Sequence, residues 1–167
     1  MLIVGKHPPF IIIRRPNTDE AESISELVSS YAQKEIVLPR TVDEIRNTLE
    51  TWLVAEYDNK LVGAVSRYDY GQKLLEIRSL VVDNAYAKLG IGSILVKQMI
   101  RELHREGKEK LFVLTYSPEF FKKNGFLEVP KGSLPEKIWK DCINCANKDS
   151  CGETALIFAH SRILTRH

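Results

Sequence analysis

The chain has 167 residues, 44% of them hydrophobic, with 24 basic and 22 acidic side chains and a formal net charge of +2. We expect one domain over residues 1–167, which buries roughly two-thirds of the surface of the unfolded chain. The balanced, interspersed charges argue against a dedicated nucleic-acid or membrane-binding surface. No apolar run approaches the roughly 20 residues of a membrane span, and the N-terminus lacks a signal pattern, so we predict a cytoplasmic protein.

The first half of the chain combines two predicted helices with a group of strands. Two capping boxes start the helices, Asn17 with Glu20 and Thr41 with Glu44. Short runs rich in β-branched and aromatic residues predict strands at 10–15, 51–57, 61–68 and 74–82. We expect the last three to pair as an antiparallel meander.

The second half alternates helix and strand. Ile91, Leu95, Met99 and Leu103 recur at helical spacing and predict an amphipathic helix that ends near Gly107. The other predicted elements are strands at 111–115, 126–129 and 154–159, a short helix from Ser117-Pro118, and a helix capped by Ser133 and Glu136. This order predicts an α/β protein with a mixed, mostly antiparallel central sheet of about six to seven strands and helices on both faces.

The turn that precedes the long helix is suited to hold a phosphate. Gly90 and Gly92 allow a ligand to approach the backbone closely, and the helix directs its free N–H groups and positive dipole end toward that point. Lys88 adds a positive charge beside it. Neither of the two commonest phosphate-loop patterns fits, and a helix-capping turn would contain the same two glycines.

Residues 77–105 resemble the acetyl-CoA motif of the GNAT acetyltransferase superfamily, Arg/Gln-x-x-Gly-x-Gly/Ala after a Leu-x-Val strand. Ala87 departs from the first position of that pattern, and Lys88 is the candidate to replace the missing contact. The segment 120–126 resembles the second recurring motif of the superfamily. The resemblance implies the GNAT fold, acetyl-CoA as cosubstrate, and cofactor contacts from Leu80, Val81, Val82, Ala87, Lys88, Leu89, Gly90, Ile91, Gly92, Ser93 and Phe121.

Four segments, 37–40, 76–80, 112–115 and 134–139, resemble the acetyltransferase domain of N-acetylglutamate synthases, particularly their short stand-alone form. This resemblance implies an amino-acid N-acetyltransferase that acts on glutamate, a small-molecule amine, in arginine biosynthesis. Homodimers are frequent in the superfamily, so the resemblance also allows a homodimer. The chain has no room for the arginine-sensing domain of the two-domain form, so arginine feedback of that type does not follow from the resemblance.

The resemblance implies direct attack of an amine on the acetyl-CoA thioester. An α-amino group with a pKa near 8 is only about one-tenth neutral at pH 7, so a general base helps. Glu76 is the candidate base, acting through water; the alternative is that it only pairs with Arg78. Backbone N–H groups at 80–82 are the candidate oxyanion donors. Phe121 stands where the superfamily usually has a tyrosine acid, so Tyr116 is the candidate acid, or else a buried or capping tyrosine.

Planar guanidinium groups match the carboxylates of a glutamate substrate. Arg40 and Arg78 are the candidates, with Lys137 as a third; the alternative for Arg40 and Lys137 is a solvated surface charge. Arg78 is the strongest candidate because a charge among apolar neighbours should be paired. Arg14 and Arg15 are expected at the surface.

The three cysteines of the chain, Cys142, Cys145 and Cys151, lie close together in the sequence. Structural zinc normally takes four ligands, so a zinc site would need one more from nearby Asp141, Asp149 or Glu153, or from His160. The alternatives are a local disulfide, which is unusual in a cytosolic protein, and three unlinked thiols. No histidine neighbours the run to activate a cysteine nucleophile.

Two other functions fit the same sequence. One keeps the fold and changes the acceptor to a polyamine, a drug amine or a peptide N-terminus. The other is a non-catalytic acetyl-CoA-binding or metal-sensing module, suggested by Ala87, Phe121 and the cysteine run. Turnover with any amine above the background rate would exclude the non-catalytic module and leave only the enzymatic functions.

Overall fold

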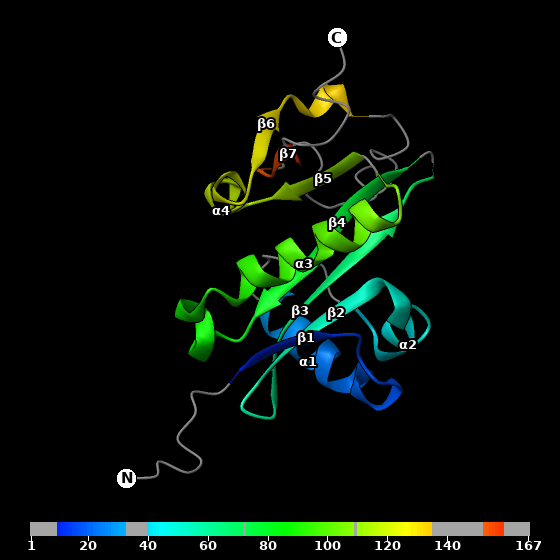
Figure 1. Ribbon diagram of the computed structural model, residues 1–167, viewed down its shortest axis with the longest axis vertical. Coiled ribbons are helices and arrows are strands. Elements are labelled where there is room, and N and C mark those ends of the chain that lie inside the picture. The colour runs from blue at the N-terminus through cyan, green and yellow to red at the C-terminus, as the bar shows by residue number, and fades with distance from the viewer. Residues whose placement is uncertain (1–9, 33–39, 72, 109, 135–151, 159–167) are drawn as a thin grey trace. The chain divides into compact units, whose positions relative to one another are not determined.

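The computed structural model describes residues 10–32, 40–71, 73–108, 110–134 and 152–158 (Figure 1). Its strands are β1 (Ile11–Arg14), β2 (Trp52–Tyr57), β3 (Lys60–Asp69), β4 (Leu74–Val82), β5 (Lys110–Thr115), β6 (Phe126–Val129) and β7 (Thr154–Phe158). Its helices are α1 (Ala21–Ala32), α2 (Val42–Arg46), α3 (Ile91–Arg105) and α4 (Pro118–Lys123). Short 3-10 helices are η1 (Thr18–Glu20), η2 (Leu49–Thr51), η3 (Asn84–Leu89) and η4 (Lys131–Ser133). The strands predicted from sequence are confirmed; the helix predicted from the Ser133 and Glu136 capping box falls on residues that lie outside the described part of the chain.

The strands form a seven-stranded sheet in the order β1-β2-β3-β4-β5-β7-β6. β1 and β2, β2 and β3, β5 and β7, and β6 and β7 pair antiparallel, whereas β4 and β5 pair parallel. The predicted α/β class and number of strands are therefore confirmed, and the sheet is mixed. No helix of the described residues is long and apolar enough to cross a membrane.

Residue contacts divide the chain into two compact units. The first comprises 1–66 and 79–99, and the second comprises 67–78 and 100–167. The strands β3 and β4 and the helix α3 contribute residues to both units. Each unit has a hydrophobic core of its own.

The core of the first unit joins α1 and α2 to the sheet. Its fully buried members are apolar residues from both helices and from β2, β3 and β4: Ala21, Ile24, Val28, Ile45, Trp52, Val54, Ala64 and Val81. The helix α1 supplies its share because its apolar residues recur at helical spacing. Thr41 caps α2 as predicted, since its Oγ1 accepts a hydrogen bond from the Glu44 N–H at 3.1 Å.

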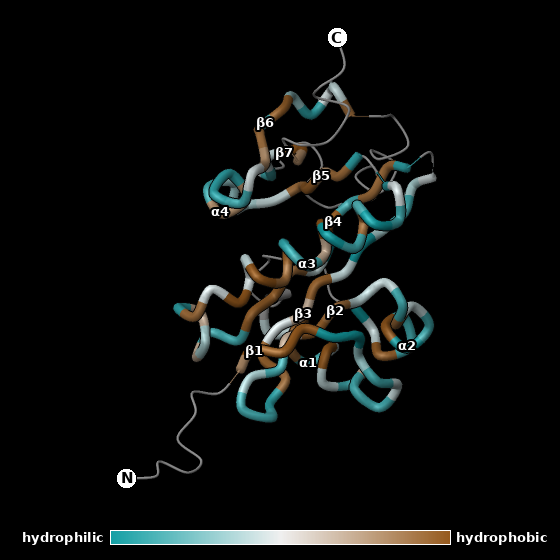
Figure 2. The backbone as a smooth tube through the Cα atoms, viewed as in Figure 1, coloured by the Kyte–Doolittle hydropathy of each residue, from teal (hydrophilic) through white to brown (hydrophobic). Residues whose placement is uncertain are grey.

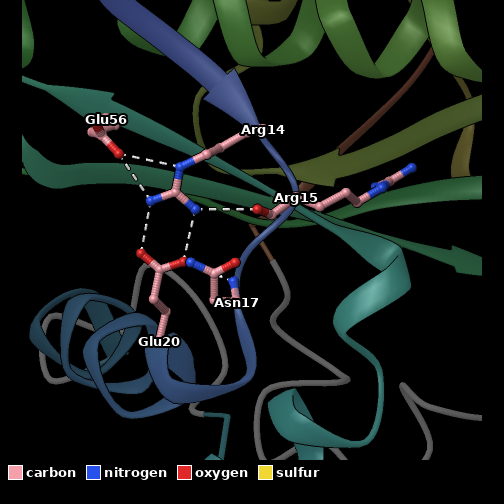
Figure 3. A network of polar contacts seen from close by, with 5 residues as sticks. All are labelled: Arg14, Arg15, Asn17, Glu20 and Glu56. Atoms are coloured by element: carbon pink, nitrogen blue, oxygen red, sulfur yellow. Dashed lines mark hydrogen bonds and ion pairs between the residues drawn. The ribbon is translucent and has the colours of Figure 1, made fainter.

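Arg14 links three elements of the first unit (Figure 3). Its guanidinium donates two parallel hydrogen bonds to the Glu20 carboxylate, at 2.7 and 2.8 Å, and one from Nε to Glu56 Oε1 at 3.2 Å. The same Glu20 carboxylate accepts the N–H of Asn17 at 2.7 Å, which completes the N-terminus of η1. Arg14 was expected at the surface, and its side chain is 29% exposed, but it is also held by two carboxylates, of which Glu56 on β2 is distant in the sequence. Arg15 is exposed, and it donates to the Trp52 carbonyl at 2.9 Å.

The core of the second unit lies on β4, β5 and β7 and includes one residue that follows η4. Its buried residues are Leu74, Phe112, Leu134, Ala155 and Ile157. A second group of aromatic rings joins α4 to β6, where Phe121 packs edge-on against Phe126 at 5.3 Å between ring centroids. Hydrophobic residues colour most of β5 and β7 in Figure 2, as expected for strands with both faces covered.

The charge network at Arg14 predicts a stability effect that depends on pH. Replacement Arg14→Met should lower the free energy of unfolding by about 1–3 kcal/mol at neutral pH, because two partly buried carboxylates lose their donor. Hydrogen bonds from Arg14 hold the pKa of Glu20 below its usual range. The stabilisation is therefore fully present at pH values above the pKa of Glu20 in the unfolded chain, which is about 4.3. It is lost as the pH falls through the lower pKa of Glu20 in the folded protein.

Urea unfolding of both proteins between pH 7 and pH 3 measures this prediction. Arg46→Met is the matched control, because Arg46 forms an exposed pair with Asp43 within α2, and it should change stability by less than about 0.5 kcal/mol. A constant difference between wild type and Arg14→Met across this pH range would contradict the assignment to Glu20.

Candidate active site

The glycine-containing turn predicted from sequence connects β4 to α3. Asp83 caps the short helix η3, since its Oδ1 accepts the Ala85 N–H at 3.0 Å. Gly90 ends η3 with a φ of +75°, in the left-handed region that favours glycine, and α3 begins at the next residue. Residues 87–90 are exposed, so the N-terminus of α3 is open to a ligand.

The turn fits a phosphate group. The helix α3 is 15 residues long and begins at Ile91 and Gly92, and the N–H groups in the first turn of an α-helix point outward along its axis, where they can meet an anion. Nothing lies within 4 Å of the position that a Cβ on Gly90 would take, so a ligand can reach the backbone there. Lys88 is exposed on the same turn.

A second glycine, Gly63 on β3, brings α3 close to the sheet. A Cβ at this position would lie 3.1 Å from Ile91 Cγ2, 3.1 Å from Leu95 Cδ1 and 3.3 Å from the Val81 carbonyl. These contacts are tighter than ordinary van der Waals packing, so the first turn of α3 rests directly on the backbone of β3. Gly63 therefore fixes the position of the phosphate-fitting turn.

The strand β4 changes conformation at Ser79, whose φ is +53°. This left-handed conformation is uncommon for a residue other than glycine and breaks the regular alternation of the strand. Arg40 donates from Nε to Ser79 Oγ at 3.3 Å, and the Arg40 carbonyl accepts from Ser25 Oγ at 2.8 Å. The predicted cofactor residues 80–82 follow, with Val81 buried at 1% exposure.

Glu76 and Arg78 lie together on β4, as the residue spacing predicts. Arg78 Nε donates to Glu76 Oε1 at 2.6 Å, and the two side chains are 20% and 9% exposed respectively. Tyr70 Oη donates to the same Glu76 oxygen at 2.9 Å and accepts from Arg78 Nη2 at 2.7 Å. The Arg78 guanidinium also stacks over the Tyr68 ring, 4.1 Å from its centroid.

Burial and charge act together on this cluster. Burial alone would lower the pKa of Arg78, but the negative charge of Glu76 outweighs it, and the pKa is raised. Burial raises the pKa of Tyr70, and the Glu76 charge raises it further against the opposing effect of Arg78. Arg78 therefore stays positive and Tyr70 stays a neutral phenol at physiological pH.

Tyr116 and Phe121 follow β5 in different environments. Tyr116 is 46% exposed, directly after the end of β5, and its ring lies 3.5 Å from the position that a Cβ on Gly152 would take. Phe121 is 4% exposed on α4, where its ring packs edge-on against Phe120. A buried ring at this position fills the core, and a tyrosine hydroxyl there would need a polar partner.

Several predicted residues lie outside the described part of the chain. Lys137 and the three cysteines, Cys142, Cys145 and Cys151, fall in residues 135–151, which the structure does not describe. Within the described residues, no group of three His, Cys, Asp or Glu side chains is placed to hold a metal ion.

Sequence reasoning missed three residues of this region: Tyr70, Ser79 and Gly63. The Tyr70 N–H donates to the Leu74 carbonyl at 2.9 Å across the turn at Gly71. With Tyr70 opposite Leu74 in the hairpin of β3 and β4, Tyr68 lies opposite Glu76, and Tyr70 lies diagonally across from Glu76. This register could have identified Tyr68 and Tyr70 as neighbours of Glu76. Nothing in the local sequence predicts the left-handed conformation of Ser79.

Comparison with known proteins agrees with this geometry. The model of the acetyltransferase (GNAT) family matches residues 18–126. An uncharacterized N-acetyltransferase of Chlorobaculum tepidum is 37% identical over 145 residues, which cover 87% of this chain and 94% of that protein. An amino-acid acetyltransferase of Mycobacterium tuberculosis is 31% identical over 133 residues, which cover 78% of this chain and 76% of that protein.

Solved structures show the same fold. N-acetylglutamate synthase from Neisseria gonorrhoeae, complexed with coenzyme A and N-acetyl-glutamate, superimposes with a TM-score of 0.80 at 23% identity, over 89% of this chain and 35% of that chain. A Mycobacterium tuberculosis protein in complex with CoA superimposes with a TM-score of 0.75 at 25% identity, over 88% of this chain and 98% of that chain.

The mixed sheet and the match to the family model define an acyltransferase that uses acetyl-CoA. Because the family model matches more than half of its residues, the chain belongs to the acetyltransferase (GNAT) family. The predicted GNAT fold and the predicted cosubstrate, acetyl-CoA, are confirmed.

The close contact at Gly63 predicts a loss of stability on substitution. Gly63→Val should lower the free energy of unfolding by about 1–3 kcal/mol, because the new side chain overlaps Ile91 and Leu95 and pushes α3 from the sheet. Chemical denaturation measures the loss. The same substitution at Gly132, where an added Cβ meets nothing within 4 Å, serves as control. Equal effects at the two positions would show that α3 does not depend on Gly63.

Proposed function

We propose that this acetyltransferase transfers the acetyl group of acetyl-CoA to the α-amino group of L-glutamate and so makes N-acetylglutamate, the first step of arginine biosynthesis. The whole chain, residues 1–167, acts as one GNAT domain in this proposal. The observation that carries it is the buried pair of Glu76 and Arg78 on β4, a base beside a carboxylate-binding group. The names of the amino-acid acetyltransferase and N-acetylglutamate synthase relatives support the choice of substrate.

The cofactor is held by its phosphates and by the end of β4. The backbone N–H groups at the start of α3, with Gly90, Gly92 and Lys88, bind the pyrophosphate, since they combine donors that point outward along the helix axis with positive potential. The backbone at 80–82 contacts the acetyl and pantetheine end. Ser79 supports this assignment, because its left-handed conformation interrupts the strand immediately before these residues.

Glu76 acts as general base. The ammonium group of the amino acid releases a proton to the Glu76 carboxylate through a water molecule, and the neutral amine nitrogen attacks the thioester carbonyl carbon in a ternary complex. Burial of Glu76 at 7% exposure places the carboxylate out of bulk solvent. Its hydrogen bonds to Arg78 and Tyr70 hold it in one orientation.

The tetrahedral intermediate then collapses. Backbone N–H groups at 80–82 stabilise its oxyanion, the C–S bond breaks, and the CoA thiolate leaves. Tyr116 is the proposed donor of the proton that the thiolate takes up, and the second proton of the attacking nitrogen, released through water as the amide forms, restores the Tyr116 hydroxyl. Its exposure at the end of β5 leaves the side chain accessible, whereas the Phe121 ring on α4 carries no proton to give.

Arg78 and Arg40 bind the two carboxylates of glutamate. Arg78 lies two residues from the base on β4, and Arg40 contacts Ser79, which follows Arg78 in the chain. A guanidinium donates two parallel hydrogen bonds to a carboxylate, which fixes the direction of the acceptor as well as its charge. Lys137 remains a proposed third contact.

The first experiment follows thiol release from acetyl-CoA with a panel of amino acids, polyamines and peptides. Glutamate should be the best acceptor, and Glu76→Gln should lower kcat by about 10²–10⁴-fold with the affinity for acetyl-CoA unchanged, because only proton removal is impaired. Glu128→Gln, at an exposed position on β6, should behave as wild type. Faster turnover with a polyamine or peptide would support the alternative acceptors, and unchanged kcat in Glu76→Gln would remove the general base.

A second prediction tests the carboxylate-binding role of Arg78. Arg78→Lys keeps the positive charge beside Glu76 but loses the planar pair of donors, so KM for glutamate should rise by roughly 10–100-fold while KM for acetyl-CoA stays the same. Steady-state kinetics with each substrate varied in turn provides the two constants. If the acceptor is instead a polyamine or a peptide, Arg78→Lys should leave the KM for that acceptor unchanged.

A further inference from the structure

The hydroxyl of Tyr70 is a shared partner of both charged side chains at the proposed site. It donates a hydrogen bond to Glu76 Oε1 at 2.9 Å and accepts one from Arg78 Nη2 at 2.7 Å. Arg78 Nε donates to the same Glu76 oxygen at 2.6 Å. The three polar groups therefore form a closed triangle in which each contacts the other two.

The triangle distinguishes the two oxygens of the Glu76 carboxylate. Both hydrogen bonds end on Oε1, one of them from a guanidinium, and these donors compete with a proton for the lone pairs of that oxygen. A proton that arrives at Glu76 is therefore favoured on Oε2. The direction of Oε2 is fixed as long as Oε1 is held by its two donors.

The Tyr70 ring is itself held in place by its neighbours. Its centroid lies 5.8 Å from that of Phe112, which is fully buried, and 4.8 Å from that of Tyr68. Tyr68 also lies under the Arg78 guanidinium. These contacts do not involve the hydroxyl, so removal of the hydroxyl alone should leave the ring where it is.

We propose that Tyr70 is a positioning residue for acetyl transfer. Its hydroxyl orients the Glu76 carboxylate so that Oε2 receives the proton of the amine. The same hydroxyl fixes the plane of the Arg78 guanidinium, which binds the carboxylate of the acceptor. This inference rests on the proposed roles of Glu76 and Arg78. It adds a residue of the turn between β3 and β4 that contacts neither substrate and acts through both charged groups. A phenol suits this task because one hydroxyl both donates and accepts.

The test compares Tyr70→Phe with Tyr57→Phe, which removes a hydroxyl from β2, far from this cluster in the sequence. With the best acceptor from the amine panel, Tyr70→Phe should lower kcat and raise KM for the acceptor, each on the order of tenfold. KM for acetyl-CoA should stay constant, and Tyr57→Phe should match wild type. In a Glu76→Gln background the kcat effect of Tyr70→Phe should disappear, because the hydroxyl acts through Glu76.

Tyr70→Phe kinetics equal to wild type would overturn the inference. An undiminished kcat effect in the Glu76→Gln background would do the same, since it would indicate a general structural role. The assay uses the best acceptor found in the amine panel. If the enzyme does not acetylate glutamate, the proposed substrate is wrong, but the comparison of Tyr70→Phe with wild type is still valid.

A measurement without turnover tests the same geometry. The Nε–H proton of Arg78, observed by NMR in the resting protein, should exchange slowly with water in wild type and Tyr57→Phe and faster in Tyr70→Phe. Unchanged exchange in Tyr70→Phe would show that the hydroxyl does not hold the guanidinium. This result does not depend on which amine is acetylated, so it separates failure of the inference from failure of the proposed function.

Discussion

The burial of a carboxylate on β4 is the constraint around which the proposed site is organised. Moving an ionised group out of water costs several kcal/mol unless opposite charge and hydrogen bonds replace the lost hydration. Glu76 is 7% exposed, and Arg78 and Tyr70 supply that replacement at hydrogen-bonding distance. Arg78 in turn needs a surface for its flat guanidinium, which the Tyr68 ring provides. One buried acid therefore accounts for the paired guanidinium of Arg78 and for the two tyrosines that contact the pair.

The strand β4 combines several proposed functions because of one local change in its backbone. Before Ser79 the strand carries the charged pair, and its residues Leu74–Glu76 pair with Lys110–Phe112 of β5. The left-handed conformation of Ser79 ends the regular alternation, and the cofactor segment 80–82 follows. Gly90 and α3 come next along the chain, so acid-base chemistry and cofactor binding are adjacent in sequence. The charge network at Arg14 lies on other elements and serves stability instead.

Local patterns in the sequence predicted the elements well. The buried stripe of α3 follows from its 3.6-residue period, and all four of its members are at most 2% exposed: Ile91, Leu95, Met99 and Leu103. Ile94, which precedes Leu95 in the helix, lies at the edge of that stripe and is 36% exposed. The capping residue Thr41 was also recognisable, because a cap bonds to a backbone group only a few residues away.

The partners of charged residues were harder to predict. Arg14 was expected at the surface, and only the pairing of β1 with β2 brings Glu56 to its guanidinium. Tyr70 was overlooked for a similar reason, since its role depends on the hairpin register rather than on its neighbours in sequence. The position of β7 between β5 and β6 likewise follows from pairing over a long stretch of chain.

The sequence by itself determined the order of the helices and strands, the glycine turn that is the candidate phosphate site, and the residues on β4 that carry charge. These properties depend on interactions within about ten residues, where side-chain periodicity, caps and glycines act directly on the backbone. Only the tertiary structure decided that Tyr70 joins Glu76 to Arg78, that Gly63 brings α3 close to the sheet, and that Arg14 is enclosed by two carboxylates. Each of these contacts is made when separate segments pack together, because a buried polar group takes whichever partner the fold places within reach.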